Sequence, residues 1–152
     1  MLFIFYKLIH FLKRILFRIF KIKTLGVRAL ILKDNQVLLV RHTYLKGWYL
    51  PGGGVEHSES PPQGVIREVG EEVGGVVTEP VKLLAAYHNN KLGWDDYVLL
   101  HEVKLSHQCE RHDFEIAEVC WFDIHHLPND ISPGTQKRID EHLFNQPIVE
   151  HW

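Results

Sequence analysis

Residues 53–75 read GGVEHSESPPQGVIREVGEEVGG, and this stretch decides the fold. It contains Ser-Pro-Pro-Gln at residues 60–63, where the serine can cap a helix, the first proline can start it and the glutamine can close a capping box. The two glycines at residues 74–75 are typical of a helix end. The sequence therefore predicts a helix over residues 61–73. The Pro-Gly-Gly-Gly run at residues 51–54 predicts a loop whose backbone can approach a ligand closely.

Three carboxylates fall in the second half of this helix. Glu71 and Glu72 lie three and four positions after Glu68, so a regular helix places all three on one face. Like charges at that spacing repel each other by roughly a few tenths of a kcal/mol per pair. A solvated face is the ordinary explanation for acidic residues alone. Together with the glycine loop, these residues favour a site for a hard divalent cation with oxygen ligands, Mg²⁺ or Mn²⁺.

The fixed spacing in this stretch resembles the Nudix box, the signature of the Nudix hydrolases. That box consists of Gly, five residues, Glu, seven residues, Arg-Glu, an apolar residue, any residue, Glu-Glu, any residue, Gly and an apolar residue. The chain departs from it at the last position, where Gly75 replaces the apolar residue and Val76 could pack in its place. The matching residues are Gly53, Glu59, Arg67, Glu68, Val69, Glu71, Glu72 and Gly74.

The resemblance covers residues 24–145 and implies an α/β fold, namely an α/β/α sandwich with a mixed β-sheet. It also implies hydrolysis of a nucleoside diphosphate linked to another moiety, with water attacking phosphorus. The resemblance leaves open which nucleotide is hydrolysed. A base could stack on one of several aromatic residues, and each of these could instead pack in the core: Tyr44, Trp48, Tyr87 and Tyr97.

The resemblance also implies a role for each residue of the acidic helix. Glu68, Glu71 and Glu72 would hold Mg²⁺ or Mn²⁺ together with the backbone carbonyl of Gly52. Arg67 would orient these carboxylates as their ion-pair partner. The number of metal ions is left open.

The general base is also open, because family members use either a glutamate of the box or an acid that precedes a later strand. Outside the box the candidates are Asp113, Glu115 and Glu118, of which Glu115 is preferred. A non-catalytic Nudix-like module that binds a nucleotide is the alternative function. Such modules usually lose box carboxylates, whereas this chain keeps them all, so the sequence favours an enzyme.

Beyond residue 24 apolar runs alternate with polar turns, which predicts strands and a second helix. Ser132 is expected to cap that helix, which should run to about Phe144. Ile139 would face the core, whereas Asp140 and Glu141 would face solvent. The first two strands should form a hairpin around residues 33–35. The expected strands cover residues 25–32, 36–41, 76–88, 94–103 and 115–122.

Residues 1–23 predict a basic amphipathic helix that is separate from a domain over residues 24–152. Residues 1–24 carry six Lys or Arg and no acid, although the formal net charge of the whole chain is -2. Charges near the middle of the segment argue against a helix that spans a membrane, and a cleavage site typical of signal peptides is lacking. The segment could lie on an anionic membrane or pack on protein, and the sequence leaves both open.

The rest of the chain has eleven basic and nineteen acidic residues, which argues against nonspecific binding to nucleic acid. A small nucleoside diphosphate derivative is therefore the expected partner, and no specific nucleic acid is expected. Only two Cys are present, so nothing indicates a disulfide framework. We expect a cytoplasmic protein, with peripheral contact at the inner membrane face as an option. The oligomeric state is left open.

Overall fold

The computed structural model describes residues 15–152 apart from 18, 21, 91–92 and 109–114. The first fourteen residues of the expected N-terminal helix therefore lie outside the described part. Asp113, one of the candidate bases, lies outside it as well. Within the part of the chain that the structure describes, no helix is long and apolar enough to cross a membrane.

Strands make up a larger and a smaller sheet. They are β1 (Lys23–Lys33), β2 (Gln36–His42), β3 (Gly75–Val77), β4 (Lys82–Asn89), β5 (Asp95–Val103), β6 (Leu105–Gln108) and β7 (Ile116–Asp123). The larger sheet has the order β4-β5-β1-β2-β7. It is mixed, because β1 and β5 pair in parallel whereas the pairs β4–β5, β1–β2 and β2–β7 are antiparallel. β3 and β6 form the smaller, antiparallel sheet.

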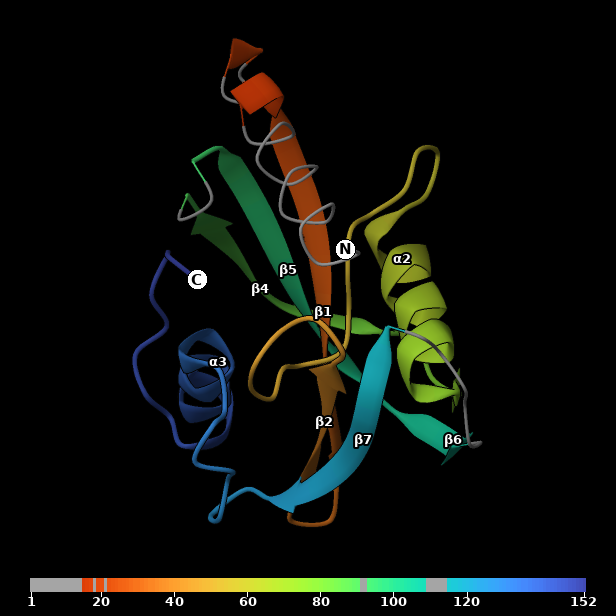
Figure 1. Cartoon of the computed structure of the whole chain (residues 1–152). Coiled ribbons are helices and arrows are strands. Elements are labelled where there is room, and N and C mark those ends of the chain that lie inside the picture. Colours follow the sequence, from red (N-terminus) through yellow and green to blue (C-terminus); the bar gives the residue numbers. More distant parts are fainter. Residues whose placement is uncertain (1–14, 18, 21, 91–92, 109–114) are drawn as a thin grey trace.

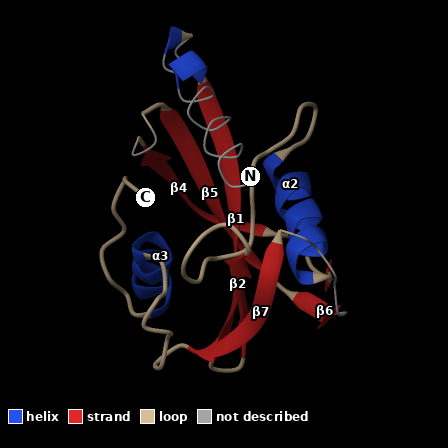
Figure 2. Cartoon of the chain, viewed as in Figure 1, coloured by secondary structure: helices blue, strands red, loops and turns tan. Residues whose placement is uncertain are grey.

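Helices lie on opposite faces of the larger sheet (Figures 1 and 2). α2 (Pro61–Glu68) continues into the π-helical turn η1 (Val69–Val73), and α3 (Pro133–Leu143) covers the other face. Alternate residues of β1 point to the two faces. Ala29 packs in the cluster under α2 and η1, and Leu30 packs in the cluster under α3. The expected α/β/α layering is therefore confirmed.

Most of the expected elements are present, but the strand expected over residues 76–88 is wrong. The chain forms β3 and β4 there, separated by residues 78–81. Pro80 lies in that break and has no N–H to donate to a sheet. The short strand β6 was not predicted from the sequence. It pairs with β3, which places Leu105 opposite Val77.

The prediction that Glu141 faces solvent is also wrong. Glu141 is only 5% exposed, because the C-terminal segment folds back over α3. Arg138 Nη2 donates to Glu141 Oε1 at 2.8 Å, and Arg138 Nη1 donates to the carbonyl of His151 at 3.2 Å. The backbone N–H of Val149 donates to Glu141 Oε1 at 3.3 Å, and Tyr87 Oη donates to Oε2 at 3.0 Å. The carboxylate is thus buried inside a polar network.

Candidate active site

The acidic helix begins as its sequence predicts and then departs from regular geometry. Ser60 caps α2, since its hydroxyl accepts from the N–H of Gln63 at 3.4 Å and the Gln63 Oε1 accepts from the N–H of Ser60 at 2.9 Å. From Val69 the chain continues as the π-helical turn η1, and it stops at Gly74, whose φ is 68°. Turns of this type are rare and occur frequently at functional sites. The sequence predicts the helix but not this turn.

Arg67 joins the acidic helix to the glycine loop. Its Nε donates to Glu59 Oε1 at 2.9 Å, and its Nη1 donates to Glu68 Oε1 at 2.8 Å and to Glu71 Oε2 at 3.1 Å. Its Nη2 donates to the carbonyl of Gly54 at 2.9 Å. These bonds, above all those with Glu59, raise the pKa of Arg67, and the same contact lowers the pKa of Glu59. One guanidinium therefore fixes three carboxylates of the box relative to the loop.

Glu72 contacts the glycine loop. Its Oε2 accepts a hydrogen bond from the backbone N–H of Gly52 at 2.8 Å, and the residue is 9% exposed. Burial raises the pKa of the Glu72 carboxyl to about 7, and the Gly52 N–H and the charge of Arg28 oppose that shift. Burial also raises the pKa of Glu68. The three carboxylates therefore have unequal surroundings, and Glu71 is the most exposed of them.

The glycine loop runs beside β1, and its tight approach depends on the absence of side chains. Gly52 has a φ of 135°, and a Cβ there would collide with the carbonyl of Val27. A Cβ on Gly53 would collide with the carboxylate of Glu68. The N–H of Val27 in turn donates to the carbonyl of Gly53 at 2.9 Å. The loop therefore holds backbone polar groups within reach of the acidic helix.

The departure from the box at Gly75 has a packing explanation. A Cβ at Gly75 would lie 2.9 Å from the side chain of Leu105, which fills the space that an apolar residue would take. Val76 does not substitute for it as expected, because Val76 is 47% exposed. The unpredicted strand β6 therefore supplies the missing apolar contact.

The structure distinguishes among the candidate bases outside the box. The charge of Glu115 acts on Glu72 and is the smallest of the contributions to its raised pKa. Glu115 precedes β7, and its carbonyl accepts from the N–H of Thr43 at 2.9 Å. Glu118 instead forms an ion pair with Arg41 at 3.0 Å. Of the two described candidates, Glu115 is the one whose charge reaches Glu72.

The donor chemistry of this region fits a hard divalent cation. Glu68, Glu71, Glu72 and the Gly52 backbone offer only oxygen atoms, which Mg²⁺ and Mn²⁺ prefer. A buried carboxylate with a raised pKa gains from a neighbouring positive charge. Among the described residues, no three His, Cys, Asp or Glu side chains are already gathered as a metal-binding group. Glu68 and Glu71 contact Arg67 instead, and Glu72 contacts Gly52.

Comparison with known proteins agrees with this geometry. The model of the NUDIX domain matches residues 22–143. The chain belongs to the Nudix family. Both the family and the fold expected from the box are thus confirmed. Nudix hydrolases generally use divalent metal cations, in agreement with the oxygen donors of the acidic helix.

Two curated relatives illustrate how this Nudix chain relates to named proteins. A putative ADP-ribose pyrophosphatase YjhB of Bacillus subtilis is 43% identical over 65 residues, which cover 43% of this chain and 31% of the relative. An RNA pyrophosphohydrolase of Xylella fastidiosa is 29% identical over 125 residues, which cover 82% of this chain and 58% of the relative. This Nudix chain therefore spans less than two thirds of the length of either relative.

Solved Nudix structures share the fold. A NUDIX hydrolase from Nitrosomonas europaea superposes with a TM-score of 0.72 at 23% identity, and the match covers 82% of this chain and 90% of the hydrolase chain. A UDP-X diphosphatase superposes with a TM-score of 0.63 at 27% identity, and the match covers 82% of this chain and 65% of the diphosphatase chain. The likeness to the first structure concerns the fold alone.

Two of the aromatic residues considered for base stacking belong to the core of this Nudix domain. Trp48 and Tyr87 are 4% and 1% exposed and pack in the cluster under α3. Arg28, whose contact with phosphates or with solvent the sequence leaves open, has a charge that acts on Glu68 and Glu72. Its only signal in the sequence is a basic residue within an apolar strand.

Proposed function

We propose that the chain is a metal-dependent hydrolase that cleaves a nucleoside diphosphate linked to another moiety, with Mg²⁺ or Mn²⁺ as the metal. The main support is the buried carboxylate of Glu72, which faces the glycine loop beside Glu68 and the charge of Arg28. The names of relatives agree in reaction class, since they include pyrophosphatase, pyrophosphohydrolase and diphosphatase. The reaction is attack of water on phosphorus.

In this proposal the residues of the box have different roles. Glu68, Glu71 and Glu72 hold the cation together with the carbonyl of Gly52. When bound, the cation neutralises charge on the diphosphate and lowers the pKa of a bound water. Arg67 is a positioning residue, because its bonds to Glu59, Glu68 and Glu71 set where these carboxylates lie.

Glu115 is the proposed general base, which accepts a proton from the attacking water. The influence of its charge on Glu72 supports this assignment, because a base must lie close to the site that binds the reacting group.

A panel of substrates tests the proposed function directly. Purified protein is incubated with NTPs, nucleoside diphosphate sugars and dinucleoside polyphosphates, with Mg²⁺, with Mn²⁺ and with a chelator. We expect release of a nucleoside monophosphate or of pyrophosphate from at least one member, only in the presence of metal. Absence of turnover on every member would instead favour the non-catalytic nucleotide-binding module.

We further propose that residues 1–23 are a peripheral anchor on an anionic membrane, separate from the domain over residues 24–152. The support is their six basic residues without an acid, together with outward-facing apolar side chains at the end of the segment. Phe17 instead packs on Trp94 with ring centroids 5.3 Å apart. The exposed apolar residues are Ile15 at 40%, Leu16 at 50%, Ile19 at 66% and Phe20 at 69%.

Co-sedimentation with vesicles tests this anchor. The full chain should bind vesicles that contain anionic lipid, bind neutral vesicles less and dissociate as salt rises, because salt screens surface charge. Deletion of residues 1–14 removes half of the basic residues but keeps Phe17, so it should reduce vesicle binding and preserve the melting temperature. A full chain that ignores vesicles, with a deletion variant that aggregates, would show that the segment packs on protein instead.

A further inference from the structure

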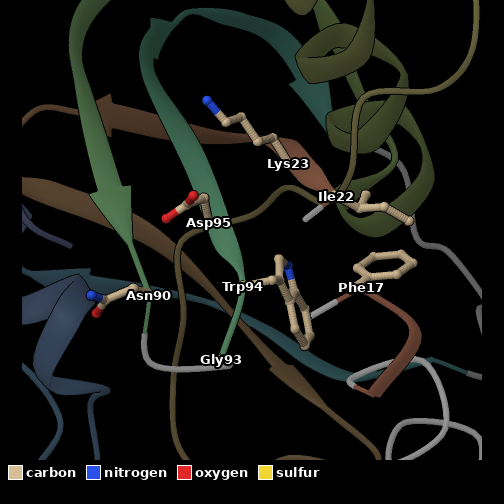
Figure 3. A pocket seen from close by; sticks show the side chains of 7 residues that line it. All are labelled: Phe17, Ile22, Lys23, Asn90, Gly93, Trp94 and Asp95. Carbon is tan, nitrogen blue, oxygen red and sulfur yellow. The ribbon is translucent and has the colours of Figure 1, made fainter. Parts of the chain in front are cut away.

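A pocket of about 490 Å³ lies where the N-terminal segment, the start of β1 and the turn between β4 and β5 meet (Figure 3). The rings of Phe17 and Trp94 lie next to each other on one side of it, and Asn90 lies on the far side. The lining residues are Phe17, Ile22, Lys23, Asn90, Gly93, Trp94 and Asp95. The pocket is separate from the acidic helix, since no residue of α2 or η1 lines it.

The indole of Trp94 is held in a fixed orientation. Its Nε1–H donates to Thr24 Oγ1 at 3.0 Å, and the Thr24 hydroxyl donates to Asp96 Oδ1 at 2.6 Å. Phe17 meets the indole edge to face, with an angle of 79° between the rings. A ring that is already ordered loses little freedom when a ligand stacks on it, which favours binding. Trp94 is thus a preformed stacking surface.

The remaining lining is polar and suits the edge of a heterocycle and the hydroxyls of a sugar. Lys23 and Asn90 bring side-chain N–H donors, and Asn90 and Asp95 bring acceptor oxygens. Asp95 Oδ1 already lies 2.8 Å from His88 Nε2, so its carboxylate is held in place. Stacking on an aromatic side chain tolerates any base, because every base has a π face.

We propose that this pocket binds the base and ribose of the nucleotide substrate, an inference that rests on the proposed diphosphate hydrolysis. The pocket and the acidic site share strand β1. Lys23 lines the pocket, and Arg28, whose charge acts on Glu72, follows five residues later. At the rise of a strand the two positions are about 16 Å apart. The segment that follows the glycine loop reaches the same end of β1, since the N–H of Val55 donates to the carbonyl of Leu25 at 2.9 Å.

Binding of nucleoside monophosphates without metal tests the pocket independently of catalysis. The full chain is titrated with AMP, GMP, CMP and UMP by isothermal titration calorimetry in the presence of a chelator. At least one should bind saturably, and Trp94→Leu should weaken that binding by about tenfold or more, because base stacking is lost. Phe17→Leu removes the other aromatic ring that lines the pocket and should weaken the binding of the nucleotide less. Trp94→Phe keeps an aromatic face and should restore part of the affinity.

The variants must also separate this proposal from the proposed function. In the substrate panel, Trp94→Leu should raise KM for the nucleotide that is hydrolysed and leave kcat near the wild-type value. Metal-dependent turnover with KM and binding unchanged in both Trp94→Leu and Phe17→Leu would overturn the pocket and leave the hydrolase intact. Saturable binding that depends on Trp94, in a protein without turnover, would support the pocket and overturn the hydrolase.

Discussion

Glu72 and Glu141 are both carboxylates that the fold removes from water, yet their surroundings differ. Glu141 accepts from three directions, namely from Arg138 at 2.8 Å, from Tyr87 at 3.0 Å and from the N–H of Val149 at 3.3 Å. For Glu72 the described hydrogen bond comes from the N–H of Gly52 at 2.8 Å. The guanidinium of Arg67 serves Glu59, Glu68 and Glu71 instead.

The difference separates a carboxylate that supports the fold from one that is available for chemistry. Buried charge is costly unless a counter-charge and hydrogen bonds compensate it. Around Glu141 the compensation comes from Arg138, which also stacks over the ring of Tyr87 at 3.9 Å. Around Glu72 burial outweighs the nearby positive charge of Arg28, so the pKa of Glu72 rises to about 7. Glu72 therefore keeps an uncompensated carboxylate for a cation, whereas Glu141 is compensated within the fold.

The largest effect that tests this comparison is expected at Glu141. Glu141→Leu leaves Arg138 buried without its partner, and loss of one member of a buried ion pair costs about 3–5 kcal/mol. For a domain of this size that corresponds to a fall in the melting temperature of about 6–20 °C. Thermal unfolding measures it. Below the transition, KM and kcat should stay near wild-type values, because Glu141 lies on α3.

The double variant Arg138→Met with Glu141→Leu is the matched control. It replaces both charges by apolar groups and leaves neither one uncompensated, so it should recover much of the lost stability. A double variant as unstable as Glu141→Leu would contradict the idea that Arg138 is the source of the cost.

The next effect concerns activity at Glu72. Glu72→Gln keeps the volume of the side chain and an oxygen that can accept from Gly52, but it removes the negative charge. We expect turnover to fall by about a hundredfold or more, since removal of one strong electrostatic contribution has effects of that size. Metal-dependent initial rates measure it, and circular dichroism checks that the fold is kept. A wild-type rate with unchanged metal dependence would contradict the assignment.

Two further variants sharpen the result for Glu72. Glu115→Gln should reduce turnover but leave metal affinity unchanged, because a base acts on water and does not hold the cation. Glu79→Gln changes an exposed carboxylate that pairs with Lys104 at 3.0 Å, and it should leave activity unchanged. Equal losses in all three variants would point to a nonspecific effect of negative charge.

The contrast between these regions also explains what the sequence could and could not predict. Ser60 and Gln63 lie three positions apart, so the start of α2 is a local property and its prediction is confirmed. The burial of Glu141 depends on Val149 and His151, which the chain brings back only through its tertiary fold. The sequence of α3 alone shows two adjacent acidic residues and therefore suggests that both side chains face solvent.

The site shows the same division between local and long-range information. The spacing of Glu68, Glu71 and Glu72 predicts an acidic helix, but it does not reveal that η1 turns Glu72 towards Gly52. The pocket is still less accessible to sequence reasoning. Trp94 lines the pocket and Thr24 holds its indole, and these two residues, 70 positions apart, meet because β1 pairs with β5.

The smallest expected effect is a pH dependence of stability in the absence of metal. The pKa of Glu72 is raised from 4.5 to about 7 in the folded protein. Between those values the folded state keeps a proton that the unfolded state has released, so the free energy of unfolding falls as pH rises through this window. Glu72→Gln lacks this contribution. Without metal, its stability relative to wild type should therefore increase by about 2–3 kcal/mol from pH 4.5 to pH 8 and then level off.

Denaturant titrations of both proteins at pH 5 and pH 8 measure this difference, since the other ionisable groups, Glu68 included, are common to the two proteins. Addition of Mg²⁺ or Mn²⁺ at pH 8 should shift the difference in stability back in favour of the wild type, because a ligand that binds only the folded state stabilises it by mass action. The wild type then gains stability from metal binding, which Glu72→Gln cannot gain to the same extent. A difference that is flat with pH, or that metal leaves unchanged, would mean that Glu72 is compensated within the fold in the same way as Glu141.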